Sequence, residues 1–228
     1  MLLKFIVKDG VTSRNTPASS KKALELTIHT LHVDGVETNV YLTKDDCLII
    51  YPEERIYGIP IIEQNFTDLR GYNLGSRVKH HFLIPLQEAL DVFKNSKKEF
   101  VLQLSDHGNK NRQYVEKIIF LISQYPEINI YLKSDSEEII TLLSNSKIQH
   151  QVGAIIDSFD SKLCHFPLDF YSLNIENMDT NQALEQLANG KVLMTEQVNT
   201  VEQVRQLEQC FHDYLEQLHC VSSFPLKQ

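Results

Sequence analysis

The sequence predicts a (β/α)8 barrel, in which parallel strands close into a cylinder surrounded by helices. Apolar runs of strand length alternate with segments whose apolar residues recur at helical spacing, almost to the end of the chain. About eight such strand–helix units can be counted, and no linker suggests a second domain. Eight units in one chain favour the closed barrel over the alternative, an open doubly wound sheet. The 228 residues are sufficient for one compact barrel.

The predicted strands are short apolar runs rich in residues that pack well on a pleated surface. They cover residues 2–7, 36–42, 47–51, 100–104, 128–132, 152–156, 170–173, 191–194 and 220–223. The polar link at residues 43–46 is short, so we expect the second and third runs to form a hairpin.

The predicted helices lie between these strands and carry apolar residues on one face. The first begins near residue 21, and the others cover residues 85–93, 111–124, 136–143, 181–188 and 201–218. Ser19 or Ser20 is a suitable N-cap for the first helix, and Gly190 is a suitable C-cap for the fifth. We therefore predict one barrel domain over residues 1–228, with a small insertion at about 52–83. That insertion is long for a loop, which indicates that it extends over the functional face of the barrel or contains short helices.

The composition excludes several classes of partner. A formal charge of −8 argues against nucleic acid or an anionic membrane as the main partner. No stretch approaches the roughly 18–20 apolar residues of a membrane span, and the N-terminal apolar run is too short for a signal peptide. The four cysteines are scattered, as is typical of free thiols in a reducing compartment. We expect a cytoplasmic protein.

Six blocks of sequence, in the right order, resemble the glycerophosphodiester phosphodiesterase family. The most informative block covers residues 35–45, where GVETNV and LTKD are similar to the family's G-x-E-x-D-V-x-x-T-K-D-G. The other blocks are FTDL at 66–69, IPLQEAL at 84–90, DSFD at 157–160, VNTVEQV at 198–204 and SSFP at 222–225. Together they extend over nearly the whole chain.

The resemblance implies a fold and a reaction. The fold is a (β/α)8 barrel with a small insertion after the second strand. The reaction is metal-assisted hydrolysis of glycerophosphodiesters to glycerol 3-phosphate and an alcohol. In the family, two histidines act as general acid and base, and three carboxylates hold a Ca²⁺ or Mg²⁺ ion.

The chain departs from the family at both histidine positions. Lys8 stands where the first histidine of the family's H-R-G belongs, and Pro52 stands where the second histidine belongs. Proline has no acid–base function, and the histidine of the first motif is not kept. The chain also has no tryptophan, and the family's tryptophan position falls on Met194 or Glu196.

The metal site is altered in the same direction. Glu37 matches the first ligand, but the second and third carboxylates correspond to Asn39 and Gln103, and the lysine of the family's E-x-K corresponds to Ser105. Two near-isosteric amides keep shape and hydrogen bonding while removing charge. Because affinity for these cations depends on ligand charge, we expect a weak or lost site. Restoring both carboxylates, as Asp and Glu, is expected to raise metal affinity.

Two functions follow from these substitutions. The first is a catalytically inactive member of the family that acts as a binding or regulatory protein, without a cofactor. Its ligand would be a small phosphorylated or glycerol-containing molecule, with Lys8, Arg14 and Ser105 as candidate contacts. The alternative is an active phosphoric diester hydrolase of lipid metabolism that uses Ca²⁺ or Mg²⁺ and relocated catalytic groups. His107, which follows a barrel strand, and the pair at 80–81 in the insertion are the candidates for that relocation.

The sequence does not indicate a protein partner or an oligomeric state. Four further histidines are expected to be surface or structural groups. His29 and His32 belong to the first predicted helix, while His212 and His219 belong to or adjoin the last one.

Overall fold

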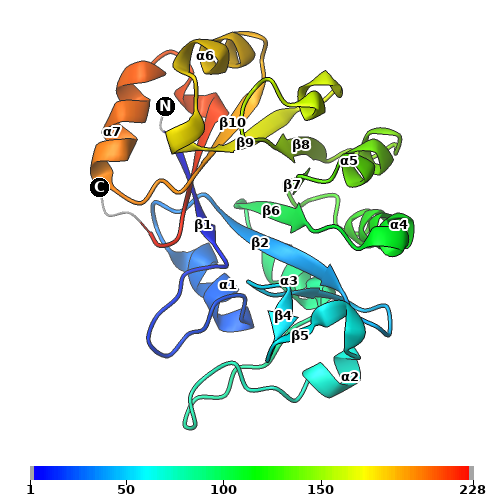
Figure 1. The fold of residues 1–228 in the computed structure, drawn as a ribbon. Coiled ribbons are helices and arrows are strands. Elements are labelled where there is room, and N and C mark those ends of the chain that lie inside the picture. The colour runs from blue at the N-terminus through cyan, green and yellow to red at the C-terminus, as the bar shows by residue number, and fades with distance from the viewer. Residues whose placement is uncertain (1–2, 226–228) are drawn as a thin grey trace.

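The computed structural model describes residues 3–225 and contains a closed barrel of eight parallel strands (Figure 1). Each barrel strand pairs with its sequence neighbours, and the first strand pairs with both the second and the last. The barrel strands are β1 (Lys4–Lys8), β2 (Gly35–Leu42), β6 (Glu99–Leu104), β7 (Ile130–Ser134), β8 (Gln151–Ile155), β9 (Phe170–Asn174), β10 (Val192–Glu196) and β11 (Leu218–Ser222). The predicted closed barrel is confirmed, and the open sheet is excluded.

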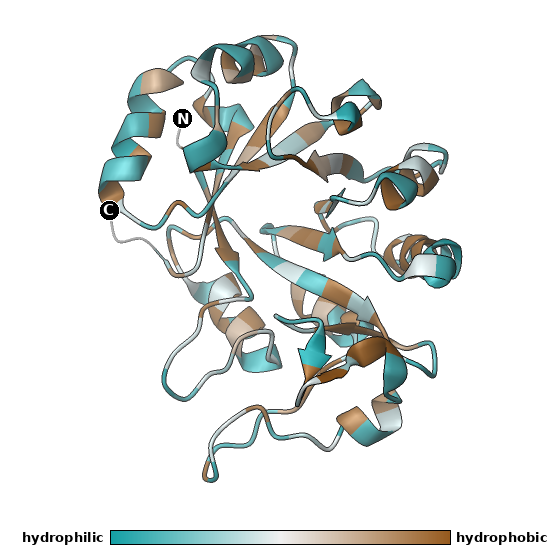
Figure 2. Ribbon diagram, viewed as in Figure 1, coloured by the Kyte–Doolittle hydropathy of each residue, from teal (hydrophilic) through white to brown (hydrophobic). Residues whose placement is uncertain are grey.

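Helices surround the barrel and turn their apolar faces toward it, as the colouring of Figure 2 shows. They are α1 (Lys21–His29), α3 (Leu86–Phe93), α4 (Asn111–Ile122), α5 (Glu137–Ser144), α6 (Thr180–Ala188) and α7 (Val201–Cys210). The Ser20 side chain caps α1 by accepting a hydrogen bond from the backbone N–H of Ala23, as predicted. Gly190 follows α6 with a φ of +81°, a conformation that glycine adopts without strain.

The prediction for the last helix was wrong in its length. Helix α7 ends at Cys210 rather than near residue 218, and a turn and a short 3-10 helix (Leu215–Gln217) lead into β11. The apolar residues near the end of the predicted helix belong to that turn and to the strand. His219 therefore lies on β11 inside the barrel and is fully buried, whereas His212 lies in the turn and is exposed.

The hairpin after β2 and the following segment form a small annex beside the barrel. Strand β3 (Leu48–Ile50) runs antiparallel to β2, which confirms the predicted hairpin. The annex also contains β4 (Arg55–Ile56), β5 (Ile59–Pro60), a 3-10 helix (Ile61–Glu63) and α2 (Phe66–Leu69). A separate apolar cluster stabilises it, made of Tyr41, Ile49, Ile56, Ile61, Leu69 and Leu83. Residues 73–82 form a projecting loop that is visible at the bottom of Figure 1.

The barrel interior is built in three layers, because alternate residues of each strand point inward. The layer at the amino ends of the strands is polar and includes Lys4, Glu99 and His219. Lys4 Nζ lies 2.5 Å from Glu99 Oε1, and His219 Nδ1 lies 3.4 Å from Glu99 Oε2. The middle layer is apolar and consists of Ile6, Val101, Tyr131, Phe170, Met194 and Val221. The layer at the carboxyl ends is charged and is described below.

A glycine makes room for the middle layer. A Cβ atom on Gly153 would lie 2.5–2.6 Å from the ring carbons of Phe170, closer than real Cβ contacts allow. The Phe170 ring is completely buried at this point. The packing of the barrel interior therefore requires glycine at this position of β8.

The four cysteines are free thiols, as the sequence predicts. In the part of the chain that the structure describes, none of the helices is both long and apolar enough to cross a membrane.

Candidate functional site

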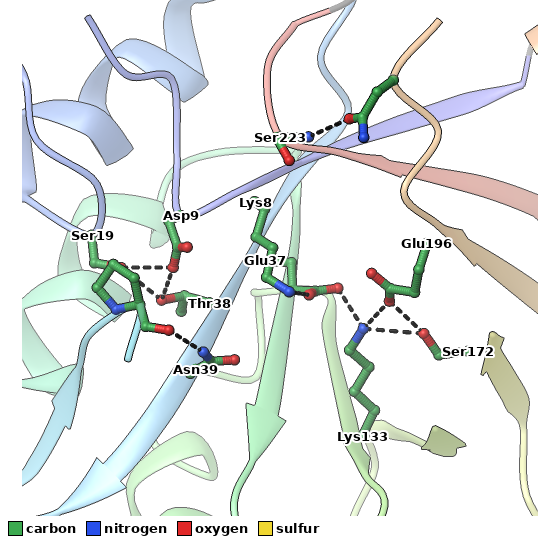
Figure 3. Close-up of polar contacts among 12 residues, drawn as sticks. Lys8, Asp9, Ser19, Glu37, Thr38, Asn39, Lys133, Ser172, Glu196 and Ser223 are labelled. Carbon is green, nitrogen blue, oxygen red and sulfur yellow. Dashed lines mark hydrogen bonds and ion pairs between the residues drawn. The ribbon is translucent and has the colours of Figure 1, made fainter. Parts of the chain in front are cut away.

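The charged layer of the barrel is organised around Lys133 on β7 (Figure 3). Its ammonium donates hydrogen bonds to Glu37 Oε2 at 2.5 Å, to Ser172 Oγ at 3.1 Å and to Glu196 Oε1. These acceptors come from β2, β9 and β10, respectively. Only 1% of the Lys133 side chain is exposed. An ammonium has three donors, so all of them are committed inside the protein.

The two carboxylates and the ammonium interact strongly because solvent is largely excluded. Burial opposes the charged form of Lys133, but the attraction of Glu196 and Glu37 outweighs it, and the pKa of Lys133 is raised. Burial and repulsion by Glu196 raise the pKa of Glu37. For Glu196, which retains some exposure, the attraction of Lys133 exceeds the effect of burial and lowers the pKa. The cluster is held together by charge complementarity.

Lys8 is the second cation of this layer, and it is more exposed and less tightly bonded than Lys133. Its Nζ lies 3.5 Å from Glu37 Oε1, an oxygen with no hydrogen-bond partner among the described residues. The Lys8 side chain is 39% exposed. Lys8 therefore balances the charge of Glu37 without a close hydrogen bond, and its ammonium N–H groups remain available toward the solvent.

The loop that follows β1 holds Lys8 in place. Asp9 adopts a φ of +57°, and its buried carboxylate accepts hydrogen bonds from Ser19 Oγ (2.8 Å) and Thr38 Oγ1 (3.3 Å). Its backbone N–H donates to the carbonyl of Glu37 at 2.6 Å. Burial raises the pKa of Asp9 despite these hydrogen bonds. Gly10 follows with a φ of +85°, and a Cβ atom there would lie 2.9 Å from the backbone of Ala23.

A cavity of about 530 Å³, lined by both polar and apolar side chains, opens at the carboxyl ends of the strands beside Lys133. Active sites of this fold lie at the same end. The wall includes charged, amide and hydroxyl side chains from seven strand ends or loops, among them Lys8, Gln103, Lys133, Asp157, Asn174, Glu196 and Ser223. Its size and lining suit a small polar ligand.

The residues predicted as metal ligands are brought together only in part. Asn39 and Gln103 are direct partners in the pairing of β2 with β6, and Gln103 pairs in turn with Lys133 on β7. Asn39 Nδ2 donates to the carbonyl of Pro52 at 2.8 Å, whereas Gln103 lines the cavity. Glu37, the one carboxylate of the predicted set, is bonded to Lys133.

The family resemblance implies a divalent cation, and these residues do not fit one. Hard cations of this kind take oxygen ligands, and their affinity rises with the number of carboxylates that are free to bind them. Among the three predicted ligands only Glu37 is a carboxylate, and the Lys133 ammonium already pairs with it and with the neighbouring Glu196. Within residues 3–225, no group of three or more His, Cys, Asp or Glu side chains is arranged to hold a metal ion.

The histidines proposed for relocated catalysis lie away from the cavity. His107 Nε2 accepts a hydrogen bond from the backbone N–H of Leu42 at 3.3 Å, and its ring packs edge-on against Tyr114. Burial lowers the pKa of His107 to about 4. His80 and His81 line a different groove, between α1 and the annex. Among the described residues that line the mouth cavity, none is a histidine.

Of the three predicted ligand contacts, the structure places only Lys8 at the cavity. Arg14 is exposed in the loop between β1 and α1, and Ser105 lies just after β6 without lining the cavity. Lys133 and Ser172 are site residues that the sequence pattern did not indicate. The available signal was a lysine directly after the apolar residues 130–132 of a predicted barrel strand, since a buried lysine requires anionic partners.

Solved structures with the same fold are known, although no protein-family model and no curated protein matches this sequence. An Oleispira antarctica phosphodiesterase in complex with sn-glycerol-3-phosphate aligns with a TM-score of 0.86 at 15% identity, covering 98% of this chain and 94% of its own. A glycerophosphodiester phosphodiesterase from Parabacteroides distasonis aligns with a TM-score of 0.83 at 16% identity, covering 97% and 93%. A glycerophosphodiester phosphodiesterase from Thermotoga maritima aligns with a TM-score of 0.72 at 15% identity, covering 98% of this chain and 96% of its own. The chain has the fold of the glycerophosphodiester phosphodiesterases over nearly its whole length.

Proposed function

We propose that this chain is a glycerophosphodiester phosphodiesterase-like protein that does not hydrolyse phosphodiesters and instead binds a small ligand as a binding or regulatory protein. The observation that carries the proposal is the Lys133 ammonium bonded to Glu37 and Glu196 at the centre of the barrel mouth. The likeness to phosphodiesterases in fold supports the family origin.

Metal-assisted hydrolysis needs a cation on the phosphoryl oxygens, a base for the nucleophile and an acid for the leaving alkoxide. The described residues at the mouth offer none of these in suitable form. Lys8 and Pro52 occupy the places of the two family histidines. Glu37 is committed to Lys133, and the other two expected carboxylates are amides. These substitutions support inactivity.

The proposed ligand is a small phosphorylated or glycerol-containing molecule. Lys8 is the cation of the mouth with donors to spare, and an ammonium is a good phosphate contact. Asn199 also lines the cavity, and its Oδ1 accepts a hydrogen bond from the backbone N–H of Ser223 at 3.1 Å. That bond leaves the Asn199 amide N–H groups available as donors. The sn-glycerol-3-phosphate in the Oleispira antarctica phosphodiesterase supports this class of ligand.

Two measurements test the proposal. The purified protein is incubated with glycerophosphocholine and Ca²⁺ or Mg²⁺, and released glycerol 3-phosphate is assayed; we expect no release above a heat-denatured control. Binding of glycerol 3-phosphate is followed by calorimetry, with Lys8→Met as the test variant and Lys21→Met as a surface control. Lys8→Met should weaken binding at least tenfold, and Lys21→Met should not.

Two results would contradict the proposal. Metal-dependent turnover that disappears in Glu37→Ala would establish the alternative, an active phosphoric diester hydrolase. Binding that is equal in the wild type and in Lys8→Met would remove the proposed ligand contact.

A further inference from the structure

We infer that Lys133 is a built-in cation that takes the place of a divalent metal and keeps metal ions out of the barrel mouth. The inference rests on the proposed function, because it concerns the same mouth. It goes further by assigning the exclusion of metal to one residue that the sequence comparison with the family does not single out.

The position of Lys133 follows from strand register. Asn39, Gln103 and Lys133 stand side by side on β2, β6 and β7, in one row of the barrel wall. Glu37 stands two residues before Asn39 on the same inward face of β2. The long lysine side chain reaches across this row to Glu37, where its Nζ lies 2.5 Å from Oε2. A calcium ion lies at a similar distance from its oxygen ligands.

The charges of the cluster are already balanced without a metal. Glu37 and Glu196 supply two negative charges, and Lys133 and Lys8 supply two positive charges within 3.5 Å of these carboxylates. Ser172 Oγ bonds both the ammonium and Glu196 Oε1, the latter at 2.6 Å. A divalent cation would meet an ammonium at close range and would have to displace it from both carboxylates. The displaced ammonium would remain buried without partners, which is unfavourable.

A specific consequence separates this inference from simple loss of ligands. If the missing carboxylates alone explain the absence of a metal site, then Asn39→Asp with Gln103→Glu should create one. If Lys133 excludes the metal, the double variant should gain little, because the ammonium remains and will pair with the new carboxylates. Removal of the ammonium should be required as well.

The experiment compares metal affinity in four proteins: the wild type, Lys133→Met, the double variant Asn39→Asp/Gln103→Glu, and the triple variant that combines all three substitutions. Tb³⁺ binding is followed by luminescence excited through the tyrosines, and Ca²⁺ binding by the shift in Tm. We expect the triple variant to bind both ions at least tenfold more tightly than the double variant. Equal affinities in the double and triple variants would overturn the inference, as would a triple variant no better than the wild type.

Folding is checked by far-UV circular dichroism, and a second triple variant with Lys133→Gln carries the comparison if the methionine variant is unfolded. A measurement on the wild type is independent of any substitution. The ¹⁵N-labelled ammonium of Lys133 should give a protected NMR signal that millimolar Ca²⁺ does not shift; a shift or loss of that signal would overturn the inference. Hydrolysis of glycerophosphocholine by the wild type without metal would refute the proposed function while leaving the role of Lys133 intact.

Discussion

The Lys133 cluster makes a quantitative prediction about stability. Replacing Lys133 by methionine keeps an unbranched side chain that is one heavy atom shorter and removes its charge. Glu37, which is completely buried, then loses the partner at 2.5 Å and keeps only Lys8 at 3.5 Å. Breaking a buried ion pair by removing one partner costs about 3–5 kcal/mol, since the other charge remains in a poorly solvated site. We expect the free energy of unfolding of Lys133→Met to fall by that amount.

A companion variant separates the cost of an unpaired charge from the cost of altered packing. Glu37→Gln/Lys133→Met removes both charges of the central pair, and Glu196 retains access to water through its 17% exposure. Replacing both members of a buried pair is often neutral or even stabilising. The double variant should therefore recover most of the stability that Lys133→Met loses.

Urea unfolding followed by far-UV circular dichroism measures these differences, because the chain has no tryptophan for fluorescence. Lys21→Met is the matched control. It removes a lysine whose Nζ lies 3.0 Å from Glu88, but both side chains are well exposed. Exposed pairs contribute about 0–1 kcal/mol, so this variant should change little. The reasoning fails if Lys133→Met costs no more than the control, or if the double variant is as unstable as Lys133→Met alone.

Three further predictions concern other parts of the barrel. Gly153→Ala should lower the free energy of unfolding by about 1–3 kcal/mol, because its new methyl group collides with a buried aromatic ring. Tyr114→Phe should cost about 1–3 kcal/mol, since the buried hydroxyl donates to the carbonyl of Val40 at 2.6 Å and the carbonyl would lose this partner. Stability should fall on acidification, because burial lowers the pKa of His219 to about 3, below its unfolded value of about 6.5. The folded state then binds fewer protons than the unfolded state between these values, and stability falls by up to about 1.4 kcal/mol per pH unit as pH drops through this window.

Each of these predictions has a control. Gly71→Ala, where no atom lies within 4 Å of a new Cβ, should be nearly neutral in the same urea experiment. Tyr125→Phe removes a phenol that is hydrogen-bonded to Asp91 near the surface, and it should cost less than Tyr114→Phe. For the pH experiment, His219→Leu should reduce the dependence on pH between about 6.5 and 3. A slope unchanged in that variant would assign the acid sensitivity to other groups; the raised pKa of Glu99 acts in the opposite direction just above pH 4.5.

Most of the fold was predictable from the sequence, for an identifiable reason. Barrel strands are buried on both faces, so they read as nearly continuous apolar runs, such as residues 100–104 and 170–173. Capping residues such as Ser20 marked the starts of helices. The end of α7 was not predictable in this way, because the turn after it also contains apolar residues at intervals that suit a helix, among them Leu215 and Leu218.

Site residues could be predicted from the sequence only where they lie within a short motif that resembles the family pattern. Asn39 and Gln103 could be compared with the carboxylates of the family pattern, because each lies within a short motif on a single strand. The bond from Lys133 to Glu37 and Glu196 was not predictable, because it depends on which strands face each other across a closed barrel. The sequence separations of 96 and 63 residues carry no local signal of such a contact.

Those separations also bear on how the chain reaches its native state. Lys133 bonds to Glu37 on β2 and to Glu196 on β10, so it connects an early strand to a late one across the barrel interior. A nascent chain that has emerged only as far as β7 could pair Lys133 with Glu37, but it would lack the second carboxylate and the strands that exclude water. Contacts of such long range slow folding. We therefore expect the two halves of this barrel to fold as one cooperative unit, and a protein split between β7 and β8 to require both pieces before either becomes ordered.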